Sequence, residues 1–93
     1  MGRYEGMFIF RPELTKENLS KLLAQVQEIV EKNNGSMGEV KEWGKQRLAY
    51  PIAKCKEGVY YLVTFNIVPD AIAAIRRAFS LNESILRSLI VKI

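Results

Sequence analysis

The chain has 93 residues, 48% of them hydrophobic and 26% charged, and a formal net charge of +4. These values predict one globular domain over residues 1–93 and exclude wholesale disorder. The absence of histidine excludes a catalytic triad and a mixed Cys/His zinc site, and the single Cys55 excludes an internal disulfide or a multi-cysteine metal cluster. No apolar run approaches the roughly 18 residues of a membrane helix, so we expect a soluble domain that is neither secreted nor membrane-bound.

The first predicted strand covers residues 3–10, where side chains alternate between two faces. Tyr4 and Phe8 fall on the face that we expect to form the core. Met7 and Ile9 fall on the other face, which is more apolar than simple solvation requires. That second face is either a contact surface for a partner or an ordinary mixed surface.

An amphipathic helix is predicted from residue 16 to about Asn33, with Thr15 as its N-cap. Its apolar stripe consists of Leu19, Leu22, Leu23, Val26 and Val30. Asn34 and Gly35 follow the helix, and this pair is typical of a left-handed helix stop.

Residues 36–51 predict a long second strand, which Gly44 interrupts with a bulge or kink. The polar residues 53–58 predict a hairpin loop, and residues 59–68 predict a third strand rich in β-branched and aromatic side chains.

A second helix is predicted to open at Pro69, because proline is tolerated in the first helical turn. Its buried face consists of Ile72, Ile75 and Phe79. Residues 85–93 predict a last strand, whose register decides whether Arg87 or Ser88 faces the helices.

The predicted order is therefore strand, helix, strand, strand, helix, strand. With right-handed crossovers this order closes into an α+β, ferredoxin-like sandwich, a four-stranded antiparallel sheet with both helices on one face. Its usual strand order of 4-1-3-2 places the second and fourth strands at the edges. The fold hosts enzymes, sensors and RNA binders alike, so it does not decide the function.

The positive charge is concentrated in residues 45–56, because the charges of the rest of the chain cancel. This segment holds four cations and no acid, namely Lys45, Arg47, Lys54 and Lys56. It also contains Tyr50, and Trp43 lies just before it. Cations interleaved with aromatic rings are typical of phosphate contact and base stacking. The alternative is an edge strand that lysines protect from aggregation.

The sequence favours a binding protein over an enzyme. Cys55 lies between two lysines, but the chain has no histidine base and no second cysteine to act with it. Pro12 removes a backbone donor from the segment after the first strand, where a phosphate-binding enzyme needs a cradle. We therefore expect no catalysis, no metal, no cofactor and no small-molecule substrate.

The most specific stretch is residues 43–52, which read Trp-Gly-Lys-Gln-Arg-Leu-Ala-Tyr-Pro-Ile. It resembles the signature segment of the bacterial small-subunit (30S) ribosomal protein S-six family. The opening Arg3-Tyr4-Glu5 and the closing Val91-Lys92 are also similar to that family. The resemblance covers essentially the whole chain and is in register with the predicted fold.

This resemblance implies a non-catalytic constituent of the small ribosomal subunit in the cytoplasm, a monomer when free. The family binds the central domain of 16S rRNA as a heterodimer with ribosomal protein S-eighteen. The resemblance and the cation cluster together predict RNA contacts at Arg3, Lys45, Arg47, Lys54, Lys56, Arg87 and Lys92. Contacts with the partner protein, or bracing of the hairpin, are predicted for Tyr4, Met7, Ile9, Trp43 and Tyr50. The alternative function is a protein-interaction or ligand-sensing ferredoxin-like module with no RNA role.

Overall fold

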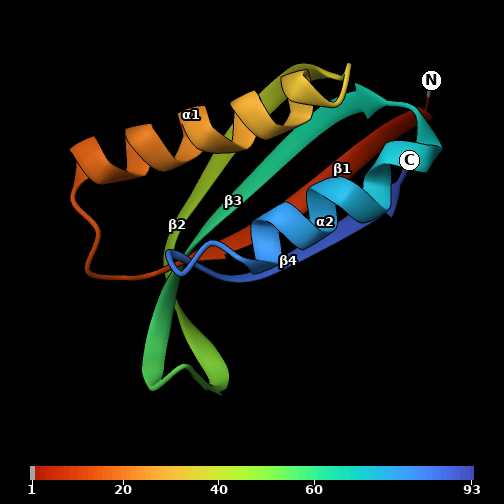
Figure 1. Ribbon diagram of the computed structural model, residues 1–93. Coiled ribbons are helices and arrows are strands. Elements are labelled where there is room, and N and C mark those ends of the chain that lie inside the picture. The colour runs from red at the N-terminus through yellow and green to blue at the C-terminus, as the bar shows by residue number, and fades with distance from the viewer. Residues whose placement is uncertain (1) are drawn as a thin grey trace.

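The computed structural model describes residues 2–93 and has the predicted order of elements. These are β1 (Gly2–Phe10), α1 (Lys16–Lys32), β2 (Ser36–Ile52), β3 (Cys55–Ile67), the 3-10 turn η1 (Pro69–Ala71), α2 (Ile72–Ser80) and β4 (Ile85–Lys92). The strands form one sheet in the order β2-β3-β1-β4, and each neighbouring pair is antiparallel. Both helices cover the same face of this sheet, and the other face is open (Figure 1). The ferredoxin-like fold is confirmed.

The hydrophobic core lies between the sheet and the two helices. Phe8 is fully buried in it and meets the ring of Phe79 from α2 edge-on, with ring centroids 5.0 Å apart. The apolar stripe of α1 adds its buried residues Leu22, Val26 and Val30. The alternation along β1 thus selects the core face that the sequence predicts.

Local signals fix both ends of α1. The hydroxyl of Thr15 accepts a hydrogen bond from the backbone N–H of Asn18 at 3.1 Å, as an N-cap should. After the helix, Asn34 adopts the left-handed conformation with φ of 64°. The predicted stop is correct, and it is the asparagine of the pair that takes the positive φ.

The bulge predicted in β2 is present at Gly44, which has φ of +84°. The pairing of β2 with β3 shifts between Glu42 and Gly44, so that Trp43 has no partner in register. The indole of Trp43 is 51% exposed.

The predicted hairpin loop over residues 53–58 is wrong. The turn consists of Ala53 and Lys54 alone, both with positive φ, which is the backbone requirement of a two-residue type I′ hairpin. Strand β3 therefore starts at Cys55 and includes Lys56 and Glu57. Their polarity suits a strand here because this end of the hairpin projects beyond the helices (Figure 1).

The two faces of β1 predict different costs of truncation. Phe8→Ala should lower the free energy of unfolding by about 3–5 kcal/mol, because it removes the ring that packs against Phe79 and leaves a cavity. Ile9 is also buried, only 8% exposed, but it lies outside the core cluster and on the open face. We therefore expect Ile9→Ala to cost less, about 2 kcal/mol. Urea denaturation of both variants checks this order, and a larger loss from Ile9→Ala would mean that the core face is misassigned.

Candidate nucleic-acid interface

Four cations gather on the outer part of the β2–β3 hairpin, which we call the basic hairpin (residues 45–57). They are Lys45 and Arg47 on β2, Lys54 in the turn and Lys56 on β3, and all four side chains are exposed. Among residues 2–93, the cations that lie within 4 Å of a carboxylate are Arg11, Lys21, Lys32 and Lys41. The cations of the basic hairpin thus have no close carboxylate within the described chain, and their charge is available to an external anion.

One acid lies on the basic hairpin next to the segment that the sequence singles out. Glu57 pairs with Arg47 across the two strands. Four cations and one acid leave the basic hairpin with a net charge of +3.

The base of the hairpin is anchored by close packing at Gly58. A Cβ added there would collide with Cγ2 of Ile9 and lie 3.6 Å from Cδ2 of Leu48. Because glycine has no side chain, Leu48 folds down over β3 onto the open face and is only 9% exposed. This packing connects the base of the basic hairpin to β1.

A hydrogen bond connects the basic hairpin with the opposite edge of the sheet. Nη1 of Arg87 on β4 donates to the hydroxyl oxygen of Tyr50 at 2.6 Å. The ring of Tyr50 itself is 58% exposed. This hydrogen bond attaches Arg87 to the basic hairpin, although the two lie far apart in the sequence.

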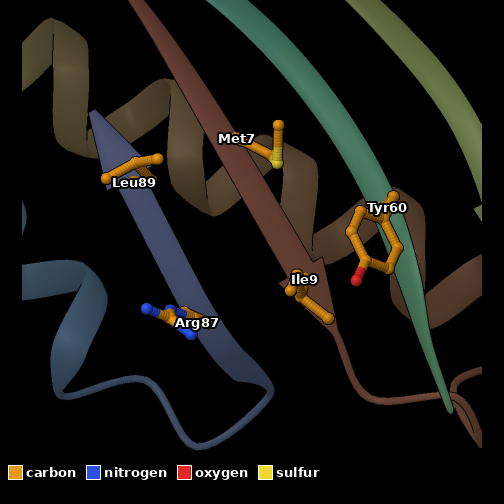
Figure 2. A pocket seen from close by; sticks show the side chains of 5 residues that line it. All are labelled: Met7, Ile9, Tyr60, Arg87 and Leu89. Carbon is orange, nitrogen blue, oxygen red and sulfur yellow. The ribbon is translucent and has the colours of Figure 1, made fainter. Parts of the chain in front are cut away.

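The open face carries a shallow apolar hollow of about 220 Å³ beside this hydrogen bond. Figure 2 shows its lining, with Met7 and Ile9 from β1, Tyr60 from β3, and Arg87 and Leu89 from β4. Tyr60 and Leu89 are not among the residues that the sequence predicts for a contact surface. Alternation along β3 and β4 was the signal that could have found them, since both residues share a face with Ile9.

The register of β4 is resolved. Arg87 pairs with Ile9 and so faces the open side, whereas Ser88 pairs with Phe8 on the helix side. Arg3 and Lys92 lie at the far end of the sheet, where the N–H of Ile93 donates to the carbonyl oxygen of Arg3. That end is roughly 20 Å along β1 from the basic hairpin, at about 3.3 Å per residue. The structure therefore separates these two cations from the other five predicted RNA contacts.

The placement predicted for Tyr4 needs correction. Its side chain is only 7% exposed, and its ring stacks on Phe65 in the core at a centroid distance of 6.0 Å. Tyr4 lies near the Arg3 end of β1, so it neither braces the hairpin nor offers a surface to a partner protein. Alternation along the strand outweighs the resemblance at this position.

Two other polar groups are engaged in contacts within the protein. Cys55 is half-buried, and Nη1 of Arg11 donates to its Sγ at 3.7 Å. On the helix side, burial raises the pKa of Tyr61, and its hydrogen bond to Glu42 raises it further. Within residues 2–93, acids and Cys55 form no group of three that could hold a metal ion. No helix of that range is both long and apolar enough to span a membrane.

The family model described as ribosomal protein S6 matches residues 3–92, nearly the whole of the chain. The chain belongs to the ribosomal protein S6 family. It is 37% identical over 92 residues to the small ribosomal subunit protein bS6 of Desulforamulus reducens, covering 99% of this chain and 97% of that one. The protein of the same name from Fusobacterium nucleatum is 35% identical, with 99% and 98% covered.

The structure of this chain has the same fold as a solved member of the S6 family. The crystal structure of 30S ribosomal protein S6 from Thermotoga maritima superposes with a TM-score of 0.90 and 26% identity. The match covers 99% of this chain and 87% of the Thermotoga chain. The resemblance that residues 43–52 carry is thus confirmed at the level of the family.

The packing at Gly58 predicts a specific coupling. Gly58→Ala should lower the free energy of unfolding by about 1–3 kcal/mol, because the new methyl group overpacks Ile9. Ile9→Ala removes the atom that collides, so the double variant should lose clearly less stability than the two single losses together. Urea denaturation of the four proteins measures this coupling, and strictly additive losses would contradict the contact.

Proposed function

We propose that the chain is a non-catalytic structural constituent of the small ribosomal subunit that binds the central domain of 16S rRNA together with ribosomal protein S-eighteen. Membership in the S6 family supports this function, as do full-length relatives named as small ribosomal subunit proteins. The function is a scaffold role in which the protein holds an RNA junction in one geometry.

The observation that carries the RNA contact is the exposed charge of the basic hairpin. Its four cations lack a close carboxylate among residues 2–93, and the end of the β2–β3 hairpin projects beyond the helices (Figure 1). Lysine and arginine at such a position neutralise phosphates and release counterions, which gives affinity without reading the sequence. Specificity then comes from the shape of the folded RNA, whose base edges are mostly hidden.

The open face supports a second protein as part of the assembly. Leu89 and Val91 are 59% and 42% exposed there, next to the hollow that Met7 and Ile9 line. Clustered apolar side chains on an exposed sheet face are typical of an interaction surface. The basic hairpin itself offers only four cations to phosphates, so a partner protein adds to the affinity. We assign this face to S-eighteen in a heterodimer, with the free chain a monomer.

Arg47→Ala tests the RNA role of the basic hairpin. The variant should fold normally, because an exposed arginine changes stability by no more than about 0.5 kcal/mol. Binding of the protein–partner pair to the rRNA should weaken, and the slope of log affinity against log salt should fall by roughly 1, one phosphate contact fewer. Filter binding at several salt concentrations measures both quantities.

The matched control is Lys32→Ala, which removes one exposed cation from the last turn of α1, just before β2 begins. It should leave the salt slope unchanged. Equal weakening by both variants would point to diffuse electrostatics. An Arg47→Ala protein with unaltered affinity and slope would favour the module without an RNA role, in which lysines merely protect an edge strand.

A further inference from the structure

A second group of cations lies at the edge formed by α2 and β4. Residues 71–93 hold four cations, Arg76, Arg77, Arg87 and Lys92, and a single acid, Glu83. None of these four cations is within 4 Å of a carboxylate among residues 2–93. A charge count over residues 57–93 hides these cations, because that segment also contains Glu57 and Asp70. The fold places Glu57 on the basic hairpin and Asp70 in η1.

Between α2 and β4 the surface forms a hollow of about 260 Å³, which we call the notch. Its lining residues are Arg76, Phe79, Ser80, Ile85, Leu86, Arg87 and Ser88, with no acid among them. Phe79 and Ile85 are buried and provide an apolar floor. An apolar floor beneath cations strengthens their attraction for an anion, because fewer waters screen it.

The hydrogen-bond donors of the notch can be assigned. The hydroxyl of Ser80 donates to the carbonyl oxygen of Arg77 at 2.7 Å, so its proton is already used. The guanidinium of Arg76 and the hydroxyl of Ser88 remain as donors. A guanidinium carries five N–H groups in a planar fork that matches two phosphate oxygens at once. The notch thus suits an oxyanion with several oxygens.

We propose that the notch binds a backbone phosphate of the RNA, with Arg76 as its principal ligand and Ser88 as a neutral donor. This inference rests on the proposed RNA-binding function and extends its footprint. Arg87 lines the notch, lines the open-face hollow and donates to Tyr50 of the basic hairpin. That continuity favours one RNA strand that runs from the basic hairpin across the edge of β4 to α2.

Arg76 and its neighbour Arg77 make a matched pair for the test. Both side chains are exposed and carry the same charge on the same helix, but only Arg76 lines the notch. Arg76→Gln should lower the salt slope of the protein–partner–RNA complex by roughly 1, so that a fourfold rise in salt weakens binding about fourfold less than in the wild type. Arg77→Gln should leave the slope close to that of the wild type. Equal changes from the two variants would overturn the site.

A titration of the free protein with inorganic phosphate separates this inference from the proposed function. At constant ionic strength, phosphate should shift the amide NMR signal of Ser88 in the wild type more than chloride does, and not in Arg76→Gln. One outcome overturns the notch and leaves the RNA function standing. In it, phosphate does not shift the Ser88 signal, Arg76→Gln keeps the wild-type salt slope, and Arg47→Ala lowers that slope. If the wild type binds no RNA, the proposed function fails, whatever phosphate does. If Arg76→Gln weakens binding to the partner protein in the absence of RNA, the notch is a protein contact and the proposal is wrong.

Discussion

The packing of Ile9 and Leu48 over Gly58 is the contact on which the interface depends. β2 is a 17-residue edge strand, and a hairpin of that length without an anchor would twist and bend freely. At Gly58 the missing side chain leaves room for Ile9 from β1 and Leu48 from β2, which are both buried on the otherwise open face. This packing, together with the hydrogen bond from Arg87 to Tyr50, connects the hairpin to β1 and β4.

Two surfaces with different chemistry meet at this anchor. One is the basic hairpin, whose charges face water and have no carboxylate within 4 Å among residues 2–93. The other is the apolar hollow around Ile9 and Leu89, suited to a protein partner. Arg87 on β4 connects the two surfaces, since it lines the hollow and donates to Tyr50 of the basic hairpin. A partner seated on the open face would therefore also act on the position of the hairpin, which gives a physical reason for RNA and protein to bind together.

Much of the fold follows from local rules that single residues reveal. Thr15 caps α1, Gly44 forms the bulge in β2, and the alternation along β1 identifies its core face. These features can be predicted because each depends on neighbours in the sequence. The short turn at Ala53 and Lys54 escaped prediction, since neither residue favours the positive φ that it adopts. The polar strand residues beyond it read as a loop for the same reason. The resemblance predicts a contact surface for Tyr4, whereas the alternation along β1 correctly places its side chain in the core. The notch was invisible because Arg76 and Ser88 meet only when α2 packs beside β4.

Ultraviolet cross-linking of the assembled protein–partner–rRNA complex, with the cross-linked residues mapped by mass spectrometry, tests the central claim most directly. Two exposed aromatic rings, Trp43 at the bulge of β2 and Tyr50 on the basic hairpin, are suited to cross-link with nearby bases. We expect RNA cross-links within residues 45–57, including Tyr50, and none in α1, where Lys21 and Lys32 are already paired with carboxylates. Cross-links confined to α1, with the hairpin unmodified, would contradict it.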